Sequence, residues 1–352
     1  MTVFKILMYP FALVYGLVMW IRNKFFDWEI LPEQSFDIPV IGVGNLMVGG
    51  TGKTPHVEYL LRMLQGNYKT ATLSRGYGRK SLGYILADAQ STAEEIGDEP
   101  LLYATKYKDT LVTVCEKRIY AIPNLIGDHP ETDVIIMDDA FQHRTVKPGL
   151  NILLSMYDKP FYNDFLLPSG TLREWKSGYQ RADIIIITKC PSDLGVHNRK
   201  EIAEKINLLP KQKLFFSKMV YQAPVNVFTG EKLIGTKNIS ALVFSGIANP
   251  HPFQNYCESI FYHIQPLEFK DHHTFDKTDI DDIIHRFEKI NGEKIILCTE
   301  KDWMRLIRTD LEPMLHNLPV YYLPIEVQLL DGEQEFTTII NKFMNSFSIV
   351  ED

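Results

Sequence analysis

A glycine-rich segment, GNLMVGGTGKT at residues 44–54, lies between an apolar run and a stretch with helical periodicity. Glycines let the backbone turn tightly, so several N–H groups can point at one phosphate chain, and the helix that follows adds the positive end of its dipole. Lys53 would then neutralise the β- and γ-phosphates, and the Thr54 hydroxyl would ligate Mg²⁺. We assign the following residues to the nucleotide: Gly49, Gly50, Thr51, Gly52, Lys53 and Thr54.

The match to the usual phosphate-loop pattern is not literal, because Met47 occupies the first glycine position. The GGTGKT run is similar to the loop of partitioning and signal-recognition ATPases, which usually have a lysine where this chain has Val48. A strand–helix turn that binds no ligand is the alternative. The coincidence of strand, GGxGKT and helix favours a nucleotide site.

Two acids, Asp138 and Asp139, end the apolar run VIIM at residues 134–137. Ligands of open parallel sheets lie at the carboxyl ends of strands, so these acids are expected beside the loop, where one of them would hold Mg²⁺ directly or through water. His143, in the same DDAFQH segment, would either lie on the surface or join the metal shell. Exposed acids that cap a strand are the alternative.

Three features favour a kinase over a switch GTPase or a motor ATPase. The TKCP segment at residues 188–191 lacks the aspartate of a guanine-reading motif. Asp98 and Glu99 precede a helix, and a kinase needs a base near its acceptor hydroxyl. Histidines in the DHH segment, residues 271–273, could orient that base. Taken singly these signals are weak, because GDEP is equally typical of a helix N-cap and DHH of a surface loop.

The elements that must position these groups follow an α/β pattern. Continuous runs of Val, Ile and Leu alternate with helical stretches, which predicts strands buried on both faces. We expect strands at residues 38–43, 70–73, 111–114, 134–137, 152–154 and 184–187, and helices at 54–64, 99–107 and 197–206. Extended segments at 214–221 and 225–228 and a second αβ pattern from residue 241 follow them.

We therefore predict an α/β fold, a P-loop NTPase-like, doubly wound and mostly parallel α/β/α sheet with a second, smaller α/β domain. The expected divisions are a membrane-associated N-terminal segment, a kinase domain, a β-type hinge, the smaller domain and a C-terminal helix that packs back on the kinase domain. Their bounds are 1–30, 31–213, 214–235, 236–324 and 325–352.

Composition limits the possible partners. The formal net charge of −7 gives no reason to expect nucleic acid, whose binders usually carry basic faces. Four cysteines without a CxxC pair argue against a disulfide framework or a zinc site. Hydrophobic residues make up 45% of the chain, enough for a real core. We expect a monomer.

The N-terminal segment is unusual in composition, because residues 6–21 carry no charge and are flanked by Lys5 and Arg22. This run is shorter than the ~20 residues that a helix needs to cross a bilayer. Pro10 and the lack of a small-residue cleavage site argue against a signal peptide. We expect attachment to a membrane surface, with aromatic residues beside cations in the headgroup zone, and a buried core helix is the alternative.

Together these residues resemble one family, the tetraacyldisaccharide 4'-kinases, which are the lipid A 4'-kinases of Gram-negative bacteria. The segments that carry the resemblance span about residues 40–305, in the family's order, and several are peculiar to the family. They are GNLMVGGTGKTP (44–55), LSRGYGR (73–79), GDEP (97–100), DDAFQH (138–143), LPSGTLRE (167–174), FKDHHTF (269–275) and TEKDWMR (299–305).

The resemblance implies transfer of the ATP γ-phosphate to the 4'-hydroxyl of a tetraacyldisaccharide 1-phosphate, forming lipid IVA. It implies a β-ladder hinge that closes on nucleotide, and a location at the cytoplasmic face of the bacterial inner membrane through the N-terminal segment. Asp98 would be the base and His272 its dyad partner, with His273 left open. Arg118 would lie near the phosphates. The acceptor side would include Arg75, Arg173 and Glu174, and the metal shell Thr54, Glu99, Asp138, Asp139 and His143.

The sequence departs from the family pattern at Met47, Ala140 and Thr171, and none of these changes removes a reacting group. Two other functions stay open. A membrane-associated ATPase of the partitioning or targeting class would explain GGTGKT but not GDEP and DHH. A non-catalytic nucleotide-binding scaffold at the membrane is the second.

Overall fold

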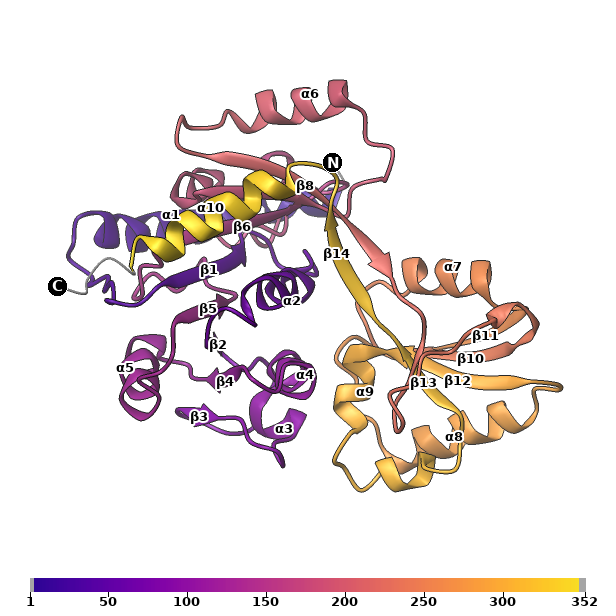
Figure 1. Ribbon diagram of the computed structural model, residues 1–352. Coiled ribbons are helices and arrows are strands. Elements are labelled where there is room, and N and C mark those ends of the chain that lie inside the picture. Colours follow the sequence, from indigo (N-terminus) through magenta and orange to yellow (C-terminus); the bar gives the residue numbers. More distant parts are fainter. Residues whose placement is uncertain (1–2, 348–352) are drawn as a thin grey trace.

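Two β-sheets form the framework of the protein in a computed structural model that describes residues 3–347 (Figure 1). Residues 1–2 and 348–352, the outer ends of the predicted terminal segments, lie outside the described part of the chain. The larger sheet has nine strands in the order β14-β8-β7-β6-β1-β5-β2-β4-β3. Their bounds are β1 Val40–Asn45, β2 Thr70–Ser74, β3 Ile85–Leu86, β4 Leu111–Val114, β5 Val134–Asp138, β6 Leu150–Met156, β7 Ile184–Thr188, β8 Lys213–Tyr221 and β14 Ile325–Leu329.

The central strands of this sheet are buried on both faces, as their continuous apolar runs predict. β1 lies between β5 and β6 and is parallel to both, whereas β3 and β14 pair antiparallel at the edges. The first strand begins at Val40, two residues later than predicted, directly after Pro39, which has no N–H to donate to a ladder. The carboxyl ends of β1 and β5 therefore meet at one edge of the sheet, where ligands of open α/β sheets bind.

Helices cover both faces of the larger sheet. α2, α4 and α10 contribute to the core on one face, through residues such as Leu60, Tyr103 and Phe336. α1 and α6 pack with the other face near β6 and β7, and α5 packs near β2 and β5. The bounds are α1 Val3–Asp27, α2 Lys53–Leu64, α3 Ala93–Ile96, α4 Asp98–Lys106, α5 Arg118–Asp128, α6 Val196–Ile206 and α10 Glu333–Asn345, with short 3-10 helices at Phe161–Asn163 and Lys176–Arg181.

The smaller sheet has five strands in the order β11-β10-β12-β13-β9, parallel except for β9. α7 packs on one face, and α8 and α9 pack on the other. The bounds are β9 Val225–Asn226, β10 Ser240–Ser245, α7 His251–Ile260, β11 His263–Glu268, α8 Lys277–Glu288, β12 Lys294–Thr299, α9 Glu300–Leu306 and β13 Val320–Leu323, with 3-10 helices at Thr236–Asn238 and Glu312–Leu315.

The predicted fold class, a mostly parallel α/β sheet with a second, smaller one, is confirmed. The two sheets are connected by β8 and β14, which pair along residues 217–221 and 325–329 (Figure 1). Residues 214–221, assigned to the hinge, thus also belong to the larger sheet, and residues 325–329 form a strand before the expected C-terminal helix. The division of the chain into domains stays a prediction.

The N-terminal segment is a helix of 25 residues with Pro10 inside it. One side of α1 packs on the larger sheet's unit through Ala12 and Phe26, which are buried. Its other side exposes apolar residues that include Leu7, Phe11, Val14, Leu17 and Val18. Over residues 3–347, no helix combines the length and the apolar character needed to cross a membrane.

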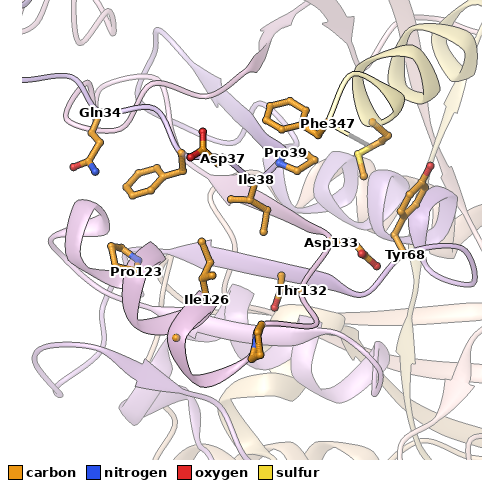
Figure 2. Close-up of a pocket in the computed structure, with 14 residues that line it drawn as sticks. Gln34, Asp37, Ile38, Pro39, Tyr68, Pro123, Ile126, Thr132, Asp133 and Phe347 are labelled. Carbon is orange, nitrogen blue, oxygen red and sulfur yellow. The ribbon is translucent and has the colours of Figure 1, made fainter. Parts of the chain in front are cut away.

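A cavity of about 740 Å³ lies at the amino ends of the central strands (Figure 2). Its lining includes Pro39 and Asp133, which directly precede β1 and β5, together with Ile126 of α5 and Phe347 after α10. The glycine-rich loop follows the opposite, carboxyl end of β1. This cavity is therefore separate from the predicted nucleotide site.

Candidate active site

The glycine-rich segment after β1 forms a loop that leads directly into α2. Gly49 and Gly52 have φ angles of 116° and 88°, a region that favours glycine. No atom lies within 4 Å of the position that a Cβ on Gly49 or Gly50 would take, so this part of the loop faces open space. Lys53 is the first residue of α2, which places the helix N-terminus at the end of the loop.

Two side chains that sequence reasoning missed fix the middle of this loop. Thr51 is fully buried, and its hydroxyl accepts a hydrogen bond of 2.8 Å from Asn45 Nδ2 at the end of β1. The Thr188 hydroxyl at the end of β7 donates to the Thr51 carbonyl at 2.9 Å. The loop is thereby tied to two strands of the larger sheet.

His56, in the first turn of α2, ties the loop to β8. Its Nδ1 lies 2.7 Å from the Gly52 carbonyl, which can only accept, so Nδ1 carries the proton and Nε2 accepts from the Ser217 hydroxyl at 3.0 Å. Burial lowers the pKa of His56 from 6.5 to about 4, so the ring is neutral at pH 7. The loop is thus in contact with one of the two strands that connect the sheets.

Asp138, the last residue of β5, lies beside the loop because the β1–β5 register pairs it with Val43. The Tyr103 hydroxyl of α4 donates to its Oδ2 at 3.0 Å. Its Oδ1 is buried and has no partner among residues 3–347. Burial raises the pKa of Asp138. The result is a fixed carboxylate with one buried oxygen still able to bind a donor or a cation.

Asp139 holds two cations. The Lys53 ammonium lies 3.2 Å from its Oδ1, and Arg173 Nη1 lies 3.0 Å from its Oδ2. Burial alone would raise the pKa of Asp139, but Lys53 and Arg173 outweigh it and hold the pKa far below its usual range. The structure therefore brings Lys53, Asp139 and Arg173 together, although the sequence analysis placed Arg173 on the acceptor side.

Arg118, the first residue of α5, is buried next to this pair of acids. Its Nη1 donates to the Asp139 carbonyl at 2.9 Å, while Nε and Nη2 have no partner within the described chain. Burial is the main cause that lowers its pKa to about 10. His143 lies close by, and burial with the charge of Arg118 lowers its pKa to about 3. Arg75 is exposed near both residues.

Asp98 begins α4, and His272 approaches it from the smaller sheet's unit. His272 Nδ1 and Arg305 Nε lie 3.5 Å and 2.7 Å from the same oxygen, Asp98 Oδ2. Burial would raise the pKa of Asp98, but His272 and Arg305 outweigh it and lower the pKa. His273 instead bonds Asp279 at 2.8 Å. Of the two histidines, the structure brings His272 to Asp98.

Glu99, expected in the metal shell, pairs with Lys301 of α9 at 2.6 Å. Across residues 3–347, no three His, Cys, Asp or Glu side chains gather closely enough to hold a metal ion by themselves. Thr54 is buried at the start of α2, one residue from Lys53. The expected shell of Thr54, Glu99, Asp138, Asp139 and His143 stays a prediction.

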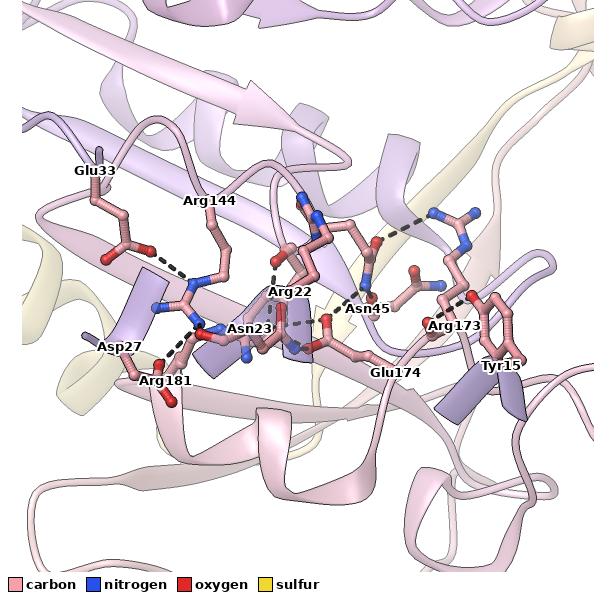
Figure 3. A network of polar contacts seen from close by, with 12 residues as sticks. Tyr15, Arg22, Asn23, Asp27, Glu33, Asn45, Arg144, Arg173, Glu174 and Arg181 are labelled. Atoms are coloured by element: carbon pink, nitrogen blue, oxygen red, sulfur yellow. Dashed lines mark hydrogen bonds and ion pairs between the residues drawn. The ribbon is translucent and has the colours of Figure 1, made fainter. Parts of the chain in front are cut away.

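Arg173 and Glu174 belong to a polar network that reaches α1 (Figure 3). Glu174 is buried and accepts from Arg181, Gln142 and Asn23 at 2.8–3.0 Å. Figure 3 shows this carboxylate near Asn23 of α1, and Tyr15 of α1 donates to the Arg173 carbonyl at 2.7 Å. Contact of these two residues with an acceptor stays a prediction.

Comparisons with known proteins agree with this geometry. The family model described as tetraacyldisaccharide-1-P 4'-kinase matches residues 4–345. The chain belongs to this family. A relative named tetraacyldisaccharide 4'-kinase from Phocaeicola vulgatus is 44% identical, with 93% of this chain and 92% of the relative covered. One of the same name from Flavobacterium johnsoniae is 43% identical, with 98% of each covered.

A solved structure supports the fold as well. It is described as an "apo" form of LpxK from Aquifex aeolicus in complex with ATP, and it superimposes with a TM-score of 0.74 at 26% identity. The match covers 97% of this chain and 99% of the other. Family membership makes the chain a kinase, and the partitioning-type ATPase is not favoured.

Sequence reasoning missed the cations on the α9 side of this site. TEKDWMR was recognised as a family segment, but no role was given to Lys301 or Arg305, which pair with Glu99 and Asp98. The available signal was the spacing of these two cations, four residues apart on a short helix, which places them on one face. Two consecutive acids in GDEP are the matching charges.

Proposed function

We propose that this protein transfers the γ-phosphate of ATP to the 4'-hydroxyl of a tetraacyldisaccharide 1-phosphate, forming lipid IVA in lipid A biosynthesis. Membership in the 4'-kinase family supports this reaction, and the ATP complex of the Aquifex relative supports the phosphate donor. One structural observation carries the assignment of the site. Tyr103, one turn after Glu99 in α4, bonds Asp138, so the helix that begins with Asp98 lies against the acid next to the phosphate loop.

The cations around Asp139 suit a triphosphate. Lys53 lies at the helix N-terminus after the loop, and Arg118 has two buried N–H-bearing nitrogens without partners among the described residues. An unpaired buried guanidinium is unfavourable by itself, so an anionic ligand would satisfy it. We assign Gly49, Gly50, Thr51 and Gly52, with these two cations, to the phosphates.

Mg²⁺ fits the residues beside the loop. Asp138 Oδ1 is buried without a partner in the described chain, and oxygen atoms of carboxylates and hydroxyls are the ligands that Mg²⁺ prefers. We assign Thr54 and Asp138 to the ion, and Glu99, Asp139 and His143 to its surroundings. When bound, Mg²⁺ would neutralise part of the charge on the phosphates.

Asp98 would act as the general base. As the acceptor oxygen bonds the γ-phosphorus, the bond from phosphorus to the β,γ-bridging oxygen breaks and ADP leaves, and the hydroxyl proton passes to Asp98. His272 lies near enough to orient this carboxylate. We place Arg75, Arg173 and Glu174 on the acceptor side, with Glu174 acting through its bonds to Arg181 and α1.

The acceptor carries four acyl chains and stays in a bilayer, so the enzyme must reach the membrane surface. The exposed apolar side of α1 suits shallow insertion at the cytoplasmic face of the inner membrane. All groups assigned above come from one chain, so we propose that it acts as a monomer.

The test uses purified protein, γ-labelled ATP and the lipid acceptor in mixed micelles. We expect label on the lipid, and mass spectrometry should locate the new phosphate at the 4' position. Asp98→Asn should lower kcat on the order of 100-fold or more while ATP binding is kept, because general bases contribute about 10²–10⁴-fold. Asp109→Asn, an exposed acid shortly after α4, is the matched control. Free phosphate with no labelled lipid would reject the kinase reaction.

A further inference from the structure

α4, which packs on the larger sheet, and α9, which packs on the smaller sheet, lie against each other and are joined by three ion pairs. Asp98 pairs with Arg305 at 2.7 Å, Glu99 with Lys301 at 2.6 Å, and Lys106 with Glu300 at 2.7 Å. Asp98, at the start of α4, thus meets Arg305 near the end of α9, and Lys106, at the end of α4, meets Glu300 at the start of α9. The candidate base lies at one end of this contact.

Residues that pack with the smaller sheet hold the Arg305 guanidinium in place, in addition to its contact with Asp98. Its Nη1 donates to Asp302 Oδ1 and to the Gly246 carbonyl, both at 2.9 Å. Asp302 is fully buried and is itself held by the Thr299 hydroxyl at 2.6 Å and the Gly246 N–H at 3.0 Å. Only 7% of the Arg305 side chain is exposed. A planar guanidinium held by two acceptors in this way has little freedom to move together with the Asp98 carboxylate.

This arrangement decides which Asp98 oxygen is open. Arg305 Nε and His272 Nδ1 both approach Oδ2, and no hydrogen bond reaches Oδ1 from the part of the chain that the structure describes. Arg305 Nη2 also lies 3.5 Å from His272 Nδ1, so one guanidinium contacts both members of the proposed dyad. The backbone of His272 bonds the same Gly246 carbonyl as Arg305.

We infer that Arg305 is a positioning residue for the candidate base. It fixes the Asp98 carboxylate through Oδ2 and leaves Oδ1 free to accept the proton of the acceptor hydroxyl. Because Arg305 comes from the smaller sheet's unit and Asp98 from the larger, the base is oriented only while α9 lies against α4. The inference rests on the proposed kinase function and deepens its account of the base.

The test measures kcat and the KM for ATP of the full-length enzyme with the lipid acceptor. We expect Arg305→Ala to lower kcat about 100-fold, the loss that a displacement of about 1 Å can cause, with the KM for ATP within about threefold of wild type. Arg305→Lys keeps the charge, and its kcat should be at least about tenfold higher than that of Arg305→Ala. Arg286→Ala, which breaks an exposed Arg–Asp pair in α8, is the matched control and should leave kcat unchanged.

A double-mutant cycle separates positioning from general support of the fold. If Arg305 acts through Asp98, Arg305→Ala should change the residual kcat of Asp98→Asn by less than about threefold. The same loss in both backgrounds would overturn the inference, as would a single Arg305→Ala variant with wild-type kcat or a lysine variant no better than alanine. Failure of wild-type enzyme to phosphorylate the lipid would instead reject the proposed function.

Discussion

The Lys53 ammonium lies 3.2 Å from the Asp139 carboxylate, so the phosphate-loop lysine is paired with the acid that directly follows β5. Asp139 also accepts from Arg173, whose Nη1 lies 3.2 Å from Oδ1 and 3.0 Å from Oδ2. A triphosphate on the loop would compete with Asp139 for the lysine. Binding of a triphosphate should therefore exchange the Asp139 carboxylate for phosphate oxygens at Lys53.

Replacement of Lys53 by methionine should weaken ATP binding and lower kcat by about 100-fold or more, because it removes a charge aimed at the phosphates in a partly buried site. Titration calorimetry gives the affinity, and the labelled-lipid assay gives kcat. Lys205→Met, at an exposed lysine paired with Glu201 on α6, should change neither quantity. Unaltered ATP affinity in Lys53→Met would exclude the phosphate-loop assignment.

The pKa of His56 predicts how the free energy of unfolding depends on pH. The folded protein lowers the pKa of His56 from 6.5 to about 4 because the ring is buried, so the unfolded chain takes up a proton at higher pH than the folded chain. This contribution to stability is complete above pH 6.5 and is lost as the pH falls toward 4. It amounts to about 3 kcal/mol, from about 1.4 kcal/mol per pKa unit.

His56→Asn should therefore lose less unfolding free energy than wild type between pH 7 and pH 4.5, although it starts from a lower value. Urea titrations at each pH measure the difference, which isolates His56 from other histidines such as His143. His263→Gln, at an exposed position on β11, is the control. Parallel pH profiles for wild type and His56→Asn would contradict the prediction.

The features that depend on a local pattern of residue types could be predicted from the sequence. Buried strands, the loop from Gly44 to Thr54 and the acids after β5 all follow from runs of residue types, and the structure places them as expected. β11 was missed because its sequence, HIQPLE, is a half-exposed edge strand that contains Pro266. Edge strands lack the continuous apolar run that marks the central ones.

Contacts between distant segments could not be predicted in the same way. His272, which has a left-handed φ of 54°, lies near Asp98, whereas its neighbour His273 bonds Asp279, and the sequence does not distinguish the two. One of the partners of Glu174, Asn23, comes from α1, 151 residues earlier in the chain. Such pairings are set by the packing of whole elements, which a single sequence does not reveal.

Substitution of Leu17 and Val18 by glutamate should weaken membrane attachment. These side chains are 55% and 59% exposed on α1, and burial of each in a bilayer interface would contribute about 1.5–3 kcal/mol. We expect partition to lipid vesicles to fall by at least about tenfold, while kcat in detergent micelles is retained. This double variant is a sharper test than deletion of α1, because deletion would also remove Asn23 from Glu174.

Ile234→Glu is the control for this experiment, since Ile234 is 89% exposed on the smaller sheet's unit, away from α1. It should partition as wild type does. Equal partition of wild type and the α1 variant, measured by vesicle sedimentation, would count against attachment through this helix.

Arg118 and Arg144 allow a test of whether a buried charge serves ligand binding or stability. Arg144 donates through Nε to Glu33 and through Nη1 to Asp27 and the Asn23 carbonyl, at 2.6–2.9 Å. Arg118 has a single hydrogen bond, to the Asp139 carbonyl, and two nitrogens without partners in the described chain. Removal of a charged side chain that makes several hydrogen bonds lowers stability, whereas removal of an unpaired buried charge relieves a desolvation penalty.

Arg118→Met should thus leave the melting temperature of the ligand-free protein unchanged or higher, and it should lower kcat by about 100-fold because the phosphates lose a preorganised donor. Arg144→Met should lower the unfolding free energy by about 1–3 kcal/mol, because it removes three hydrogen bonds but leaves Asp27 and Glu33 partly exposed to water. Added ATP should raise the melting temperature of Arg144→Met but raise that of Arg118→Met far less, since only the first keeps the proposed phosphate contact. If Arg118→Met destabilised the ligand-free protein as much as Arg144→Met does, Arg118 would be a structural residue, and its place among the phosphate contacts would have to be abandoned.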